Sequence, residues 1–319
     1  MGEAVKAPEG TRDREEELRL RGSPGRRIRR RGKSGALRRS AGVVGYVPRG
    51  ARALVSVIRG GKDQREESGK ERPGSVGLHI GGGVAAITLR RPEKRNAISQ
   101  EMWDSLLEKV RRVSTDGSVR VLVIQGAGED FSAGADLREM GSVELSEAEK
   151  IFHKMEECVS SIEECPFPTI ASLKGYALGT GLEVALACDL RIAQEGARLG
   201  MPVARLGITL SRAFVERLTS LIGPSRTKEL VYTGRMLDAR EALEWGLVNR
   251  VVPEGKSALH EAFELARTIR AQSPASLRAV KARAGSASGR EPAAYGYVDP
   301  EDFPEGVKAF LEKRAPRFG

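Results

Sequence analysis

From residue 76 onward, hydrophobic positions recur at two different spacings along the chain. Some segments repeat every second residue, as strands do, and others every three to four residues, as helices do. Alternation over 76–80 and 84–89, around three glycines, predicts a β-hairpin. Apolar positions at helical spacing after Ser99 and after Ser146 predict two helices, the second with a capping box of Ser146 and Glu149. Apolar runs at 119–124, 169–173 and 189–193 predict buried strands. Strands that alternate with helices indicate parallel crossovers and an α/β fold.

The last third of the chain is predominantly helical in its pattern. Helices are predicted over 211–222, 226–233, 239–245 and 259–271, with a short strand at 248–252. We therefore divide the chain into a basic, disordered N-terminal extension (1–75), an α/β core (76–270) and a helical C-terminal region (271–319).

The net charge of +10 changes this picture only at the N-terminus. Residues 1–75 hold 20 Lys and Arg against 10 Asp and Glu, while residues 76–319 hold 33 of each. Such a glycine-rich, basic segment buries too little apolar surface to order itself. We do not expect nucleic acid as the main partner, although RNA binding through this extension is an alternative.

Membrane association and secretion are not expected. No apolar run approaches the roughly 20 residues that a membrane span needs, and the N-terminus has no signal-like apolar segment. The three cysteines, Cys158, Cys165 and Cys188, lack metal-ligand spacing. We expect a cytoplasmic protein with buried thiols, no metal site and no cofactor.

Two loops carry the candidate chemistry, 131–137 and 179–183. Each follows a predicted strand and precedes a helix, so both belong at the carboxyl edge of a parallel sheet, where ligands bind. The second loop, Gly-Thr-Gly-Leu-Glu, places Glu183 in the first helical turn. Amide N–H groups at the start of a helix lack intrahelical partners and favour a bound anion. From these residues alone, the turn can be interpreted either as purely structural or as a binding site.

The segments 131–140 (FSAGADLREM) and 175–189 (GYALGTGLEVALACD) resemble the two signatures of the enoyl-CoA hydratase/isomerase (crotonase) superfamily. Further similar segments follow in the family's order at 89–98, 230–235, 241–252 and 305–314, so the resemblance covers about 76–319. It implies a crotonase-like spiral of ββα units with a helical C-terminal trimerisation region. It also implies a homotrimer or hexamer, with an acyl-CoA thioester as substrate and coenzyme A as part of that substrate.

By position, the resemblance gives the backbone N–H groups of Ala135 and Thr180 an oxyanion-hole role, and Glu183 an acid/base role. The residues that it places along the substrate and its CoA portion are Lys94, Arg95, Ala97, Ala133, Asp136, Leu137, Arg138, Gly179, Val203, Phe310 and Lys313. For Asp136 we favour a structural helix cap over catalysis.

The departures from the family pattern narrow the expected reaction. Thr180 replaces a common glycine, which is tolerable only at negative φ. Val203 stands where hydratases of the family carry a second glutamate, and 210–214 (LSRAF) replaces the expected Pro-Gly-x-Gly-Gly loop. We predict a hydratase-like enzyme; the alternatives are an isomerase, a decarboxylase, or a non-catalytic CoA- or RNA-binding member. Arg205, Arg212 and Glu216 could position water, but we favour structural roles for them.

Overall fold

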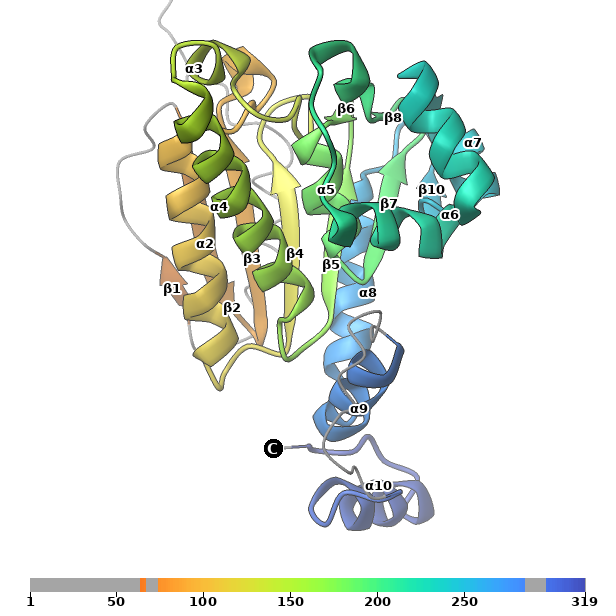
Figure 1. Cartoon of the computed structure of the whole chain (residues 1–319). Coiled ribbons are helices and arrows are strands. Elements are labelled where there is room, and N and C mark those ends of the chain that lie inside the picture. Colours follow the sequence, from red (N-terminus) through yellow and green to blue (C-terminus); the bar gives the residue numbers. More distant parts are fainter. Residues whose placement is uncertain (1–63, 67–73, 285–296, 319) are drawn as a thin grey trace, which may run out of the picture. The chain divides into compact units, whose positions relative to one another are not determined.

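The computed structural model describes residues 64–66, 74–284 and 297–318, all within the compact unit Tyr46–Gly319. Within these residues, a seven-stranded sheet forms the centre (Figure 1). In spatial order its strands are β1 (Gln64–Glu66), β2 (Ser75–Gly81), β3 (Val84–Arg90), β4 (Val121–Gly126), β5 (Thr169–Leu173), β7 (Leu190–Gln194) and β10 (Arg250–Val252). The first three strands pair antiparallel and the others parallel.

Helices cover both faces of this sheet, which is why its parallel strands read as continuous apolar runs. In β4, Leu122 and Ile124 pack with α2 (Gln100–Thr115) and α4 (Leu145–Glu163) in one core cluster. Val121 and Val123 pack on the other face with α8 (Ala258–Arg270). Figure 1 shows α2 and α4 in front of the sheet and α8 behind it.

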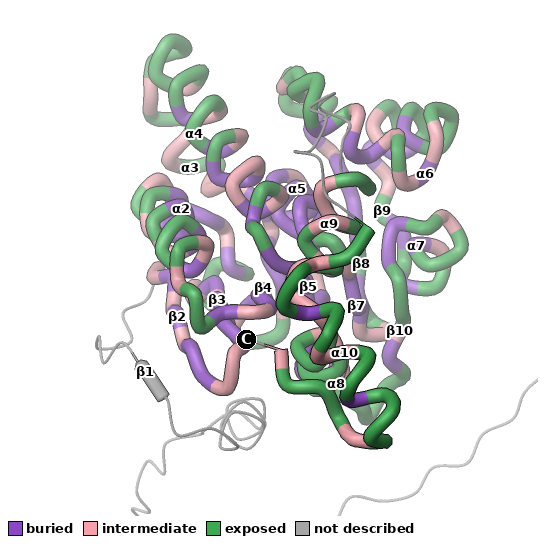
Figure 2. The backbone as a smooth tube through the Cα atoms, turned by 90° about the horizontal axis from the view of Figure 1, so that it is seen from below, coloured by how far each residue is buried: buried purple, intermediate pink, exposed green. Residues whose placement is uncertain are grey.

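The remaining elements lie around the sheet. A small second sheet orders β6 (Tyr176–Leu178), β8 (Arg198–Gly200) and β9 (Met236–Asp238). Two 3₁₀ turns are η1 (Pro92–Lys94) and η2 (Pro202–Leu206). The other helices are α3 (Leu137–Met140), α5 (Thr180–Ala187), α6 (Arg212–Thr233), α7 (Ala239–Trp245), α9 (Pro274–Ala284) and α10 (Asp302–Leu311). Figure 2 shows burial concentrated in the sheet and exposure along α10.

Most of the predicted elements are confirmed, including the hairpin, the Ser99-capped helix and the strand at 169–173. The two predicted helices at 211–222 and 226–233 form one run, α6, which is kinked at the non-helical, positive-φ backbone of Gly223 (φ 77°, ψ 164°). The expected buried, free state of the three cysteines is also confirmed. Among the described helices, none is both long and apolar enough to cross a membrane.

Three expectations need correction. The capping box of Ser146 and Glu149 is wrong, because α4 begins one residue earlier, at Leu145, with Glu144 as its N-cap. The chain does not pass directly from β5 to a turn and α5, since β6 lies between them. Strand β1 lies inside the segment 1–75; it pairs through its backbone with the edge of β2, which requires little apolar content. The other residues of that predicted extension, except Gly74 and Ser75, lie outside the described residues.

Candidate active site

The loop after β4 runs beside β6, and this pairing brings the two signature segments together. Phe131 N donates to Lys174 O (2.8 Å) and Ser132 N to Tyr176 O (2.8 Å), while Leu178 N donates back to Ser132 O (3.0 Å). Since these bonds continue a parallel ladder, residues 133–135 are carried alongside the start of α5.

Gly134 fixes how closely the two loops approach. Its φ of 99° is strained for any side chain, and a Cβ there would lie 2.8 Å from Leu178 O and 3.5 Å from Thr180 N. The backbone beside Ala135 therefore packs directly against the first amide of α5.

The backbone N–H groups of Ala135 and Thr180, predicted to form an oxyanion hole, are fixed in position by the surrounding structure but donate no hydrogen bond within the described residues. Ala135 is fixed by its neighbours, since Ile98 N donates to Gly134 O (2.8 Å) and Asp136 N to Ile98 O (3.0 Å). Thr180 is the first residue of α5, where an N–H has no partner within the helix. Among the described residues, neither N–H donates a hydrogen bond. The requirement for negative φ at Thr180 is met, since the described non-glycine residues with positive φ are Arg95, Asn96 and Lys313.

Glu183 lies in the first turn of α5 and is 9% exposed. The pKa of its carboxyl is raised to about 7, mainly by burial and also by the nearby charge of Glu156, while Arg217 opposes the rise. A carboxyl that titrates near neutrality can both accept and return a proton at physiological pH.

Asp136 has the structural role that its sequence position favoured. Its carboxylate caps α3 by accepting from Arg138 N (3.0 Å) and pairs with Arg91 Nη1 at 2.7 Å. Val203 lies in η2 and is 8% exposed within the main core cluster. The expected position of a second carboxylate is thus filled by packed hydrocarbon.

Several other predicted binding residues gather at the same edge. Arg95 O accepts from Ala133 N (2.9 Å), and the Arg95 guanidinium stacks 4.8 Å from the centroid of the Tyr176 ring. Gly179 N donates to Gly200 O (3.0 Å). Exposed or half-buried next to these, on η1, α3 and their flanks, are Lys94, Ala97, Leu137 and Arg138.

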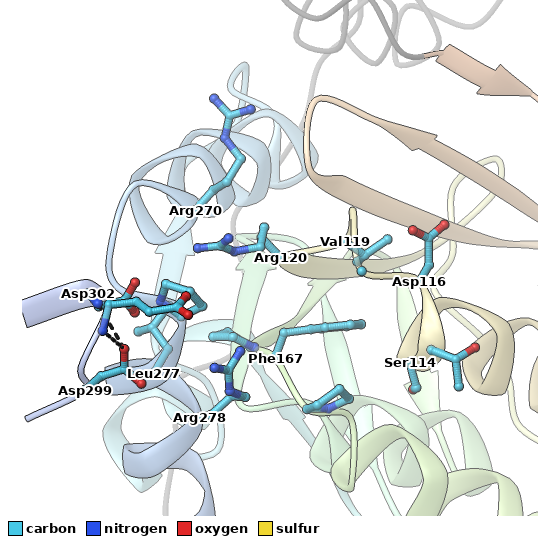
Figure 3. A pocket seen from close by; sticks show the side chains of 16 residues that line it. Ser114, Asp116, Val119, Arg120, Phe167, Arg270, Leu277, Arg278, Asp299 and Asp302 are labelled. Atoms are coloured by element: carbon cyan, nitrogen blue, oxygen red, sulfur yellow. Dashed lines mark hydrogen bonds between the residues drawn. The ribbon is translucent and has the colours of Figure 1, made fainter. Parts of the chain in front are cut away.

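Phe310 and Lys313 are not brought to this edge within one chain. Phe310 lies in the last turn of α10 and Lys313 lies two residues beyond its end. The first residue of α10, Asp302, accepts from Ser273 Oγ (2.6 Å). Asp302 also lines a pocket with Arg120 and Phe167, which come just before β4 and β5 (Figure 3). This pocket therefore lies at the amino edge of the sheet. A contact of Phe310 and Lys313 with CoA stays a prediction.

Sequence reasoning missed the residues that brace the loop. Asn96 is fully buried; its Nδ2 donates to Ala127 O and Asp130 O (both 2.8 Å), and its Oδ1 accepts from Arg91 N (2.8 Å). Ser132 Oγ donates to Asn96 O (2.8 Å). The available signal was an asparagine within a short polar turn, a residue type that tolerates the left-handed conformation seen here (φ 53°).

Comparison with known proteins shows the family to which the chain belongs. The family model for enoyl-CoA hydratase/isomerase matches residues 79–319. The chain belongs to the enoyl-CoA hydratase/isomerase family. The predictions of an enzyme of this type and of a crotonase-like fold are confirmed.

Relatives of this enoyl-CoA hydratase/isomerase family member include the mitochondrial enoyl-CoA hydratase domain-containing protein 2 of Mus musculus. It is 39% identical over 74% of this chain and 84% of the relative. The mitochondrial methylglutaconyl-CoA hydratase of Mus musculus is 34% identical over 74% and 79%. Among solved structures, an enoyl-CoA hydratase/carnithine racemase from Magnetospirillum magneticum gives a TM-score of 0.73 at 30% identity, covering 80% of this chain and 98% of the other. The enoyl-CoA hydratase of Bacillus anthracis gives 0.71 at 34% identity, covering 76% and 98%.

Proposed function

We propose that the protein converts an acyl-CoA thioester through an enolate held by the backbone N–H groups of Ala135 and Thr180, with Glu183 as acid and base. The observation that carries this proposal is the meeting of two unpaired amides beside a buried carboxyl. Each well-placed donor to a developing oxyanion lowers the barrier by about 3 kcal/mol.

Hydration of an enoyl thioester can proceed with this single carboxyl. Ionised Glu183 takes a proton from water as the water oxygen bonds to Cβ, and the electron pair of the C=C bond moves into the thioester, whose oxygen becomes the enolate oxyanion. Protonated Glu183 then returns the proton to Cα, the thioester carbonyl re-forms, and the sum is the addition of one water molecule. A pKa near 7 suits both halves of this cycle.

Isomerisation is the second candidate, and the packed side chain of Val203 favours it. Moving a double bond requires a proton to leave one carbon and return to another, which Glu183 can do alone, and an apolar wall does not bring water to Cβ. Decarboxylation of a malonyl-type thioester would likewise rely on the two amides.

The CoA portion would run along Lys94, Arg95 and Arg138, whose exposed cations can meet its phosphates. No further cofactor is required by this chemistry. Because Phe310 and Lys313 lie toward the other edge, a contribution from them would come from a second copy of the chain in the proposed homotrimer or hexamer.

The proposal is tested with the Glu183→Gln variant on a panel of enoyl- and malonyl-type CoA thioesters, with product identification. We expect kcat to fall by about 10² to 10⁴, with nearly unchanged binding of a CoA ester, because only proton transfer is removed. Formation of 3-hydroxyacyl product by the wild type assigns hydration, and a shifted double bond assigns isomerisation. Undiminished turnover in Glu183→Gln would remove Glu183 from the mechanism.

A further inference from the structure

Ser132 is a fully buried residue that joins three segments of the candidate site. Its hydroxyl donates to Asn96 O (2.8 Å), in the turn after η1, and accepts from Gly134 N (3.1 Å), in its own loop. Ser132 also packs against α5, since a Cβ added at Gly181 would lie 2.8 Å from the Cβ of Ser132 and 2.9 Å from its Oγ. One hydroxyl thus ties the loop that carries Ala135 to the Asn96 turn, in contact with the start of α5.

The hydrogen bonds of this loop leave one amide without an acceptor in the protein. Three of its amides have acceptors, and these bonds are Ala133 N to Arg95 O (2.9 Å), Gly134 N to Ser132 Oγ (3.1 Å) and Asp136 N to Ile98 O (3.0 Å). Ala135 N lies between two of these amides and donates to none of the described residues. Of the three acceptors, the one for Gly134 N is a side chain, so a substitution can remove it without changing the backbone.

The orientation of Gly134 decides where the Ala135 N–H points. The C=O of Gly134 and the N–H of Ala135 belong to one planar trans peptide, so a rotation of Gly134 turns this N–H. Glycine at φ 99° is conformationally permissive, and the surroundings must fix it. Gly134 O accepts from Ile98 N (2.8 Å), and Gly134 N donates to Ser132 Oγ. Loss of the Ser132 hydroxyl would therefore release one of the two ends that hold this peptide.

We propose that Ser132 is a positioning residue for the reaction: its hydroxyl fixes Gly134 and thereby directs the Ala135 N–H toward the thioester oxygen. This inference rests on the proposed function, in which that N–H stabilises the enolate. Ser132 is itself fully buried and acts through the neighbouring amide. A donor held in place before the reaction stabilises the transition state without reorganisation, so Ser132 affects kcat more than KM.

The test compares Ser132→Ala with Ser132→Cys and with a control, Ser114→Ala. Alanine removes the hydroxyl and both of its bonds, whereas the cysteine thiol remains a weak donor and a weak acceptor. Ser114 lines the pocket at the amino edge of the sheet, and its Oγ likewise donates to a backbone carbonyl, that of Val110 (2.8 Å). The readouts are kcat and KM on an enoyl-CoA, and the infrared carbonyl band of bound butyryl-CoA labelled with ¹³C at the thioester carbon. This saturated thioester has no double bond to hydrate or shift, so it stays unreacted in the sample.

Hydrogen bonds to a carbonyl oxygen lower its stretching frequency, so the band of butyryl-CoA should be lowered when it binds the wild type. We expect Ser132→Ala to move the band back toward its position in free butyryl-CoA. In the same variant kcat should fall by about 10- to 100-fold, with KM within about twofold of wild type. Ser132→Cys should lie between the alanine variant and the wild type, and Ser114→Ala should keep the wild-type band and kcat.

A band that stays lowered in Ser132→Ala, with wild-type kcat, would overturn the proposal, and so would an equal band shift in Ser114→Ala. If the alanine variant does not fold, an unshifted band in Ser132→Cys would overturn it. A different result separates this inference from the proposed function. If the band of butyryl-CoA bound to the wild type is not lowered, the amides do not contact the thioester carbonyl, and the proposed function itself fails.

Discussion

At Thr180 the group that the proposed function requires is the backbone N–H and not the side chain. Thr180 is 8% exposed, and its Oγ1 is buried without a hydrogen-bond partner among the described residues. Its amide nitrogen, by contrast, begins α5 and lies close to Gly134, next to Ala135. A threonine is therefore acceptable where small residues dominate, because the chemistry that we propose needs only the amide.

The Thr180→Pro variant tests this use of the amide. Proline at the first helical position is compatible with a helix, because the N–H that it removes has no intrahelical partner. We expect α5 to form and kcat to fall by about 10² to 10³, as for the loss of one oxyanion donor. Turnover and far-UV circular dichroism are measured together. Thr180→Gly keeps the amide and should keep most of the activity; an active proline variant would contradict the role of this N–H.

How well single residues could be predicted depended on whether their partners are local. Asp136 was identified as a cap because its partner, Arg138 N, is two residues away. Glu183 could be placed in the first turn of a helix by the glycine pattern before it. No sequence pattern indicated that Glu156 and Arg217 lie near Glu183, because a charged residue on an amphipathic helix normally lies on the solvent-exposed face. Their proximity to Glu183 arises only when α4, α5 and α6 pack together.

Among the elements, the loop between β4 and α3 depends on its close contact with β6. Its backbone bonds run to Lys174, Tyr176 and Leu178, and the buried side chain of Asn96 fills the turn from within. The loop that carries Ala135 is thus braced on two sides without any substrate; under the proposed function, this bracing reduces the reorganisation needed during reaction.

Gly134→Ala should disturb this contact. The new Cβ would meet Leu178 O at 2.8 Å on a backbone of φ 99°, so we expect a loss of about 2–4 kcal/mol in the free energy of unfolding and a lower kcat. Urea unfolding and turnover measure the two effects. Gly117→Ala is the control, because a Cβ there meets nothing within 4 Å, and a change within about 0.5 kcal/mol is expected. Equal stability of the two variants would show that the loop relaxes freely.

The longer elements were predictable because their periodicity extends over several turns or a whole buried strand. Helix α2 carries Met102, Leu106 and Val110 on one face, and β4 is buried throughout. Strands β6, β8 and β9 are three residues each, too short for alternation to show. They are fixed by pairing partners distant in sequence, and β6 is the strand against which the loop that carries Ala135 is aligned.

For the whole molecule, the buried Glu183 links the proposed chemistry to stability. In the unfolded chain this carboxyl titrates near its ordinary pKa of 4.5, whereas in the folded protein its pKa is raised to about 7. Between these pH values the folded state retains a proton that the unfolded state has lost. Stability from this group is therefore complete below pH 4.5 and is lost as the pH rises through 7.

The difference between wild type and Glu183→Gln isolates this effect from the other titrating groups. Glutamine is neutral at every pH, so the variant should gain stability relative to wild type by about 2–3 kcal/mol between pH 5 and pH 8. Urea unfolding at both pH values, at one fixed protein concentration, gives this difference without an association contribution that varies with concentration. Glu157→Gln removes an exposed carboxylate from the surface of α4, and its difference from wild type should hardly change over the same range. If the wild-type and Glu183→Gln stabilities follow parallel pH curves, Glu183 ionises equally in both states. The site would then lack a carboxyl group that titrates near neutral pH, on which both the proposed hydration and the proposed isomerisation depend.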